Sequence, residues 1–462
     1  MKKTFMRLSA VAAAMVAALG VSAEPFRDGD TVVFFGDSIT HGGFYHEYVA
    51  DFYTTRHPDA DIRFVNAGIG GDNAKAAQRR VPDDIEPYRP TWVTFHLGMN
   101  DIGRGAYGET SDSKALLRRE QAQTGYRANM RELIARARAA APQAKFIYLT
   151  TTPYDDTAVV TNMPPDAKGW ATVNNIGCNA GLSLMAGFVL ASAAEDKVKA
   201  VDWYSPLNAF LKRHQKEDPH FMITKWDRVH PEALGHSIMA WEFLLAQGVS
   251  PVVSEIAVDA ASGKVTRQVN AAVSSLGCDG RAVRFTALEK ALPLPVAKET
   301  LPYLAELDVE RKLNRETLRV TGLAAGDYAL LIDGREVGRY AAETFAQGVS
   351  LGFNERTPQY VQAQEVFARQ AALSARQREI RNFHASRWFY QEKAPVDDIP
   401  AFTAWVAKNV KNRTMYFNQG LDGYIGYWPK REQVREELQA KQREIRALAR
   451  PKAHDYEIRK TN

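Results

Sequence analysis

Three apolar segments in the first hundred residues each run into a polar turn that contains glycine, and this repeated pattern restricts the fold more than any other feature. The segments span residues 31–35, 61–66 and 92–97, and they are rich in the β-branched and aromatic residues that buried strands favour. Helix-like segments separate them. Strands that alternate with helices form a parallel sheet covered on both faces, and the turns that follow such strands lie at one edge of the sheet.

The same alternation continues to about residue 250. We expect further strands at residues 145–151 and 198–201, and helices at residues 44–53, 74–85, 121–141, 172–194 and 232–246. Beyond this point short strands follow one another without helices, and long charged helical segments come after them. The pattern predicts an α/β domain over residues 24–250, a small β-rich module over 251–345 and a helical C-terminal region over 346–462. The last dozen residues are expected to be frayed.

The first 23 residues have the pattern of a secretory signal peptide. Lys2, Lys3 and Arg7 precede an apolar run over residues 8–21, and small residues at 21–23 offer a cleavage site. No later segment looks long and apolar enough to span a membrane. We therefore expect a soluble protein exported to the periplasm or the medium. Loss of three positive charges lowers the formal net charge from +5 to +2, which argues against a nucleic-acid partner.

The chain has two cysteines, Cys178 and Cys278. An oxidising compartment would permit a disulfide between them, and two free thiols are the alternative. Two cysteines are too few for a four-cysteine zinc site, and no metal site is expected.

Ser38 follows the first strand by two residues, after Gly36 and Asp37. This position is a strand-to-helix junction, where unpaired backbone N–H groups and the helix dipole favour negative charge. A serine that attacks a carbonyl group and then stabilises an oxyanion is well placed there. The alternative is that Ser38 only caps the helix.

A serine nucleophile needs a base, a group that orients the base, and donors for the oxyanion. We expect His230 to be the base and Asp227, three residues earlier, to orient it. The donors are the backbone N–H groups of Ser38 and Gly71 and the side-chain amide of Asn100. Each of these residues alone could be a turn or capping residue. Their combined occurrence at one sheet edge favours catalysis.

Four segments resemble the sequence blocks of the SGNH (GDSL-type) hydrolases. They are Phe35 to Thr40, Asn66 to Asp72, Gly98 to Asp101, and Asp227 to Pro231. The resemblance extends from about residue 30 to 247. It implies a flavodoxin-like three-layer α/β/α domain that hydrolyses acetyl or short acyl esters without a metal or organic cofactor. It also assigns the nucleophile to Ser38, the oxyanion donors to Ser38, Gly71 and Asn100, and the acid and base to Asp227 and His230.

The expected function is a secreted serine esterase that removes O-acetyl groups from carbohydrate. Five residues near the predicted site are expected to contact the acylated carbohydrate or small ester substrate: Asp37, His41, Tyr45, Tyr154 and Trp226. Two alternatives remain open. One is an acyltransferase with the same catalytic residues, in which a sugar hydroxyl replaces water. The other is a glycan-binding protein whose enzyme domain is vestigial.

Overall fold

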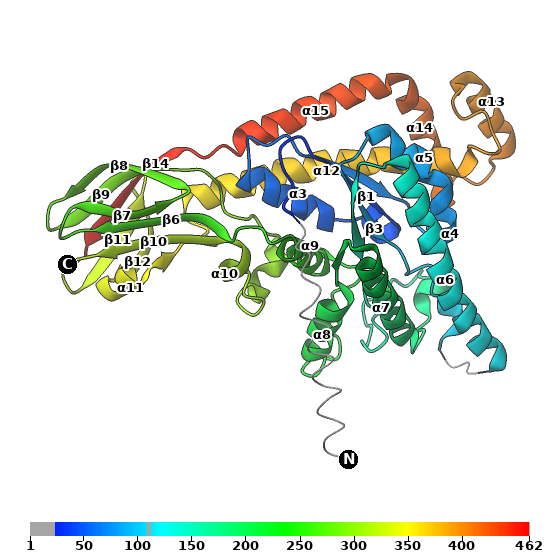
Figure 1. The fold of residues 1–462 in the computed structure, drawn as a ribbon, viewed down its shortest axis with the longest axis horizontal. Coiled ribbons are helices and arrows are strands. Elements are labelled where there is room, and N and C mark those ends of the chain that lie inside the picture. The colour runs from blue at the N-terminus through cyan, green and yellow to red at the C-terminus, as the bar shows by residue number, and fades with distance from the viewer. Residues whose placement is uncertain (1–23, 109–111, 462) are drawn as a thin grey trace, which may run out of the picture.

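The computed structural model describes residues 24–108 and 112–461. The predicted signal peptide, residues 1–23, lies outside the described residues. In Figure 1 the α/β domain and the β module lie at opposite ends of the molecule, and two long helices of the C-terminal region run between them.

The α/β domain contains a five-stranded parallel sheet in the order β2-β1-β3-β4-β5. Its strands are β1 (Thr31–Gly36), β2 (Arg63–Gly68), β3 (Trp92–His96), β4 (Lys145–Leu149) and β5 (Lys199–Val201). Its helices are α2 (Ser38–His41), α3 (Tyr45–Arg56), α4 (Ala74–Ala77), α5 (Val81–Asp84), α6 (Ser113–Ala140), α7 (Cys178–Asp196), α8 (Tyr204–His214) and α9 (Ala233–Gln247). All five predicted strands are confirmed, and this strand order is the flavodoxin-like one.

Helices cover both faces of this sheet, as the alternation of β1 shows. Val32 and Phe34 pack into the core beneath α3, α8 and α9, whereas Val33 and Phe35 pack into the opposite core beneath α4 to α7. Successive side chains of a strand point to opposite faces, so a strand buried on both faces is apolar at every position. The predicted three-layer α/β/α fold is therefore confirmed.

The expected helix over residues 74–85 is interrupted. Pro82 lies in the first turn of α5, and a 3₁₀ turn at Gln78–Arg80 separates that helix from α4. Helix α8 and several strands of the next module were not predicted from the sequence.

The β module is a sandwich of two sheets, with strand orders β13-β10-β6-β7 and β12-β11-β14-β9-β8. Its strands are β6 (Val252–Asp259), β7 (Lys264–Val269), β8 (Ala271–Cys278), β9 (Ala282–Glu289), β10 (Arg315–Thr321), β11 (Asp327–Ile332), β12 (Arg335–Ala341), β13 (Val349–Ser350) and β14 (Ala453–Lys460). Short helices α10 (Val309–Leu313) and α11 (Ala342–Gln347) connect some of them. One apolar core fills the space between the sheets.

The expectation of a frayed C-terminus is wrong. Strand β14 lies between β9 and β11 and pairs antiparallel with both. Its alternate residues His454, Tyr456 and Ile458 are buried, which is the period of a strand with one face in a core. Residues 346–461 are therefore helical over most of their length, but β14 belongs to the β module.

Four helices form the rest of the C-terminal region: α12 (Pro358–Tyr390), α13 (Ile399–Asn409), α14 (Leu421–Tyr427) and α15 (Arg431–Leu448). Helix α12, the longest, packs against α3, β2 and α14. It therefore runs from the β module to the edge of the parallel sheet (Figure 1).

The structure distinguishes one pair of open alternatives and corrects one expectation. Cys178, buried in α7, and Cys278, exposed at the end of β8, are both free, so the disulfide alternative is not realised. Helix α7 is long and apolar enough to cross a membrane by length and composition, contrary to expectation. Half of it is buried against the rest of the protein, as in the core helix of a soluble domain, so it is weak evidence for a membrane span.

Candidate active site

Ser38 is the first residue of α2, directly after β1. The N-cap of this helix is Asp37, whose carboxylate accepts a hydrogen bond of 3.0 Å from the Ile39 N–H. The capping alternative for Ser38 is therefore unnecessary, because Asp37 fills that place. The Ser38 hydroxyl instead lies 2.8 Å from Nε2 of His230. Gly36 permits this tight junction, since a Cβ there would overlap the side chain of Thr40.

The other ring nitrogen of His230, Nδ1, lies 2.7 Å from Oδ2 of Asp227. The second carboxylate oxygen accepts hydrogen bonds of 3.0 Å from the backbone N–H groups of Val229 and His230. Arg228, which lies between Asp227 and Val229 in the chain, has a φ of 66°. Its guanidinium secures this turn by donating to the carbonyl oxygens of residues 155 and 158, at 2.9 and 2.8 Å.

The protonation of this pair follows from the hydrogen bonds. Burial alone would raise the pKa of Asp227, but the hydrogen bond and charge of His230 and the two backbone donors hold that pKa below its ordinary value. The carboxylate is therefore ionised and can only accept, so Nδ1 of His230 carries a proton. This leaves the lone pair of Nε2 facing the Ser38 hydroxyl. The arrangement can remove a proton from Ser38.

The predicted oxyanion donors lie at the ends of three adjacent strands. Ser38 follows β1, Gly71 follows β2 and Asn100 follows β3, and these strands are neighbours in the order β2-β1-β3. Within the described chain, the backbone N–H groups of Ser38 and Gly71 have no intramolecular acceptor. Gly71 has a φ of 77°, which favours glycine. The Asn100 amide donates one hydrogen bond of 2.9 Å to the carbonyl oxygen of Asp72, which orients the side chain.

Two of the five predicted contact residues, Asp37 and Tyr45, have structural partners, and their contact with substrate stays a prediction. Both side chains are completely buried. Asp37 caps α2, and the hydroxyl of Tyr45 forms a hydrogen bond of 3.0 Å with Thr40 while its ring packs against Trp203. Aromatic residues close in sequence to the nucleophile belong to the core because α3 turns back beneath the sheet.

His41 and Tyr154 are also buried, at 4% and 1% exposure, and their contact with substrate likewise stays a prediction. Nδ1 of His41 accepts a hydrogen bond of 3.1 Å from the Gly70 N–H, and the Tyr154 hydroxyl donates to the carbonyl oxygen of Val173 at 3.2 Å. Each side chain therefore supports a loop. Trp226 is half-buried beside Asp227, and its contact with substrate stays a prediction.

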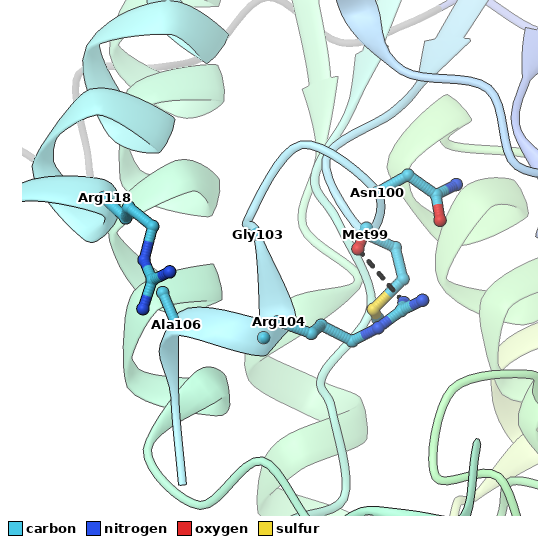
Figure 2. Close-up of a pocket in the computed structure, with 7 residues that line it drawn as sticks. Met99, Asn100, Gly103, Arg104, Ala106 and Arg118 are labelled. Carbon is cyan, nitrogen blue, oxygen red and sulfur yellow. Dashed lines mark hydrogen bonds between the residues drawn. The ribbon is translucent and has the colours of Figure 1, made fainter. Parts of the chain in front are cut away.

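A cavity of about 530 Å³ adjoins Asn100. It is lined by Met99, Asn100, Gly103, Arg104, Gly105, Ala106 and Arg118 (Figure 2). Arg104, on the turn after β3, donates to the carbonyl oxygen of Met99 at 3.2 Å, and Arg118 reaches in from α6. The volume is in the range of small-ligand pockets. The sequence analysis missed both arginines, although Arg104 follows Asn100 by only four residues.

No group of three or more His, Cys, Asp or Glu side chains that could hold a metal ion occurs in residues 24–108 and 112–461.

Comparisons with known proteins agree with this architecture. Residues 34–238 match the sequence model of the GDSL-like Lipase/Acylhydrolase family. The chain is 27% identical over 231 residues to an acetylxylan esterase from Geobacillus stearothermophilus, a match that covers 47% of this chain and 93% of that protein. The structure of this chain is similar to that of BT4096, a gut microbial diltiazem-metabolizing enzyme. The TM-score is 0.85 at 28% identity, and the match covers 95% of this chain and 99% of that one.

Proposed function

We propose that this protein is a secreted serine esterase that deacetylates carbohydrate. Residues 34–238 belong to the GDSL-like lipase/acylhydrolase family, and the chain is therefore a carboxylic ester hydrolase. The observation that carries this proposal is the continuous hydrogen-bonded chain from Ser38 through His230 to Asp227, with distances of 2.8 and 2.7 Å. A serine hydroxyl, an imidazole with the correct free nitrogen and an ionised carboxylate are the parts that acyl transfer requires.

In the first half-reaction, Oγ of Ser38 attacks the ester carbonyl carbon while Nε2 of His230 takes the hydroxyl proton. The carbonyl oxygen becomes negatively charged and accepts hydrogen bonds from the backbone N–H groups of Ser38 and Gly71 and from the Asn100 amide. The intermediate then collapses. His230 gives its proton to the departing sugar oxygen, and the acyl group remains on Ser38.

The second half-reaction repeats these steps with water. His230 removes a proton from a water molecule, whose oxygen attacks the acyl carbon of the acyl-enzyme. Collapse of the second tetrahedral intermediate breaks the bond to Oγ of Ser38 and returns the proton to that oxygen. Free carboxylic acid leaves. Asp227 stays ionised throughout and stabilises the imidazolium that forms twice in the cycle.

Two observations support a carbohydrate acetate as substrate. An acetylxylan esterase matches this chain over 93% of its own length. The cavity beside Asn100 has room for a sugar-sized group, and Arg104 and Arg118 line it with hydrogen-bond donors. Export rests on the residue pattern of the first 23 positions.

The proposal is tested by acetate release from acetylated xylan, mannan and pectin, with wild type and Ser38→Ala compared side by side. Ser205→Ala, at an exposed serine of α8, is the matched control. We expect release that depends on Ser38 and is unaffected in the control. Equal activity of Ser38→Ala and wild type would refute the mechanism. Transfer of acetyl to an added sugar in place of acetate release would identify an acyltransferase.

The similarity to the diltiazem-metabolizing enzyme favours a second candidate, because it extends through the β module and the C-terminal helices. Under this candidate the substrate is a small ester that is not a carbohydrate. Incubation with diltiazem, followed by mass spectrometry of the products, tests it. Turnover of diltiazem that depends on Ser38, without acetate release from any glycan, would replace the carbohydrate proposal.

A further inference from the structure

Residues of the C-terminal helical region contact the loop that carries Gly71. This oxyanion loop is defined here as residues 68–72. Arg381 of α12 is 5% exposed, and its Nε donates a hydrogen bond of 2.7 Å to the carbonyl oxygen of Gly68. Its two terminal nitrogens each lie 2.6 Å from an oxygen of Asp84. A guanidinium is a rigid fork, so these three bonds fix its position.

Asp84 connects Arg381 to a second buried arginine, Arg80, which has no exposed surface. Nη1 of Arg80 lies 2.7 Å from Asp84, and Nε lies 2.6 Å from Asp72 at the far end of the oxyanion loop. Nη2 of Arg80 donates to the carbonyl oxygen of Gly36 at 2.8 Å, two residues before the nucleophile. The oxyanion loop and the nucleophile turn therefore share one buried ionic network, and a residue from α12 completes it.

A second contact reaches the middle of the oxyanion loop. Tyr416 lies in the 3₁₀ turn η6 (Tyr416–Asn418), and its hydroxyl is 2.8 Å from Nδ1 of His41. The Gly70 N–H donates to the same nitrogen at 3.1 Å. Nδ1 is thus an acceptor, so the Tyr416 hydroxyl donates to it and the ring carries its proton on Nε2. Burial lowers the pKa of His41 to about 3, which agrees with a neutral ring.

Gly70 shows how closely this tyrosine packs. A Cβ at position 70 would overlap the Tyr416 hydroxyl, so the absence of a side chain there allows the contact. Gly71 is the next residue, and Asp72 on its other side is held by Arg80. The peptide that presents the Gly71 N–H is therefore fixed on both sides, by partners that the C-terminal region supplies or completes.

We propose that Arg381 and Tyr416 are positioning residues for the oxyanion loop, so that the C-terminal helical region completes the active site of the α/β domain. This inference rests on the proposed function, in which the Gly71 N–H binds the oxyanion. Such a donor acts only when it lies at hydrogen-bond distance from the charge that develops, and a displacement of about 1 Å can cost on the order of 100-fold in rate.

The test uses the full chain and two conservative variants. Tyr416→Phe removes only the hydroxyl, and Arg381→Lys keeps the charge near Asp84 but cannot make all three hydrogen bonds. Each has a matched control in the same region. Tyr424→Phe removes a buried hydroxyl that bonds to the carbonyl oxygen of Val396, and Arg387→Lys alters an arginine of α12 that pairs with Asp397.

We expect kcat to fall about tenfold in Tyr416→Phe and on the order of 100-fold in Arg381→Lys. KM should match that of the controls, because the oxyanion contact forms only in the transition state. The melting temperature of Tyr416→Phe should match that of Tyr424→Phe, because each variant loses one hydroxyl hydrogen bond. Hydrogen–deuterium exchange of the oxyanion loop should be faster in both variants than in the controls. This second measurement does not depend on activity.

The outcomes separate the two hypotheses. Wild type without turnover that depends on Ser38 would refute the proposed function, and loop exchange would still decide whether Arg381 and Tyr416 hold the loop. Turnover equal to that of the controls would overturn the positioning role. Loop exchange equal to that of the controls would overturn it as well. In Tyr416→Phe, a fall in kcat together with a melting temperature below that of Tyr424→Phe would also overturn it, because that pattern indicates a structural role only.

Discussion

Replacing Asp227 by asparagine should reverse the direction of hydrogen bonding between this residue and His230. In the wild type one carboxylate oxygen accepts from two backbone N–H groups, and the other accepts from Nδ1 of His230. An asparagine has only one oxygen. The two backbone donors, each at 3.0 Å, select that oxygen, and this turns the amide NH₂ toward Nδ1.

The consequence is the wrong tautomer of the base. Nδ1 must accept from the amide, so the proton moves to Nε2, which lies 2.8 Å from the Ser38 hydroxyl. A protonated Nε2 cannot take the proton of Ser38. A change of this kind in a Ser-His-Asp triad lowers kcat by about 10⁴-fold, or about 5.4 kcal/mol of transition-state stabilisation. The fold should be retained because the new side chain has the same shape.

The assay is the initial rate of hydrolysis of a small aryl acetate, with circular dichroism as the control for folding. Asp227→Ala is the informative comparison, because it removes the carboxylate without presenting an amide donor to Nδ1. We expect Asp227→Asn to be no more active than Asp227→Ala. An asparagine variant within tenfold of the wild type would refute the tautomer argument, and with it the role of His230 as the base.

Three further predictions follow from the same contacts. Asn100→Ala removes one of the proposed oxyanion donors and should lower kcat by about 10²–10³ at unchanged KM, measured by steady-state kinetics. A fall below threefold would exclude Asn100 from the oxyanion hole. Arg80→Met leaves Asp72 and Asp84 without a shared partner and should lower the free energy of unfolding, measured by urea denaturation, by about 3–5 kcal/mol. The control Arg136→Met breaks an exposed pair with Glu132 and should lower it by less than about 1 kcal/mol. Equal costs would show that the buried network does not stabilise the fold. Burial raises the pKa of Asp51 well above its ordinary value, so the folded state keeps a proton that the unfolded state releases above about pH 4, and stability should fall as pH rises. The Asp51→Asn variant has no such carboxyl proton, so its melting temperature minus that of wild type should increase from pH 5 to pH 8. A constant difference would contradict the buried, protonated carboxyl.

The elements of the α/β domain could be read from local patterns. Strand β1 is apolar at every position because both of its faces are covered, and the expected strand at residues 31–35 differs from the observed one by one residue. Ser38, Gly71 and Asn100 were expected at one sheet edge from their spacing relative to the strands, and the structure places them after three adjacent strands. These inferences needed only periodicity and topology.

Burial of individual side chains near the site was not predictable in this way. Tyr45 and Tyr154 have amphipathic side chains that suit either a sugar-binding surface or a core, and proximity in sequence to the active site favoured the former. The structure places both in the interior because α3 and the loop after β4 fold back against other elements. That decision depends on which surfaces pack together.

Local sequence is thus enough to predict the parallel sheet, the strand-to-helix junction at Ser38 and the three-residue spacing that brings Asp227 to His230, because each arises from residues close together in the chain. The place of β14 in the β module, and the contacts of Arg381 and Tyr416 with the oxyanion loop and His41, depend on tertiary packing. Arg381 and Gly68 are 313 positions apart, and Tyr416 and His41 are 375 apart. No local pattern records such pairs, since their contact depends on how whole domains pack and on a buried charge network whose members have no common sequence period.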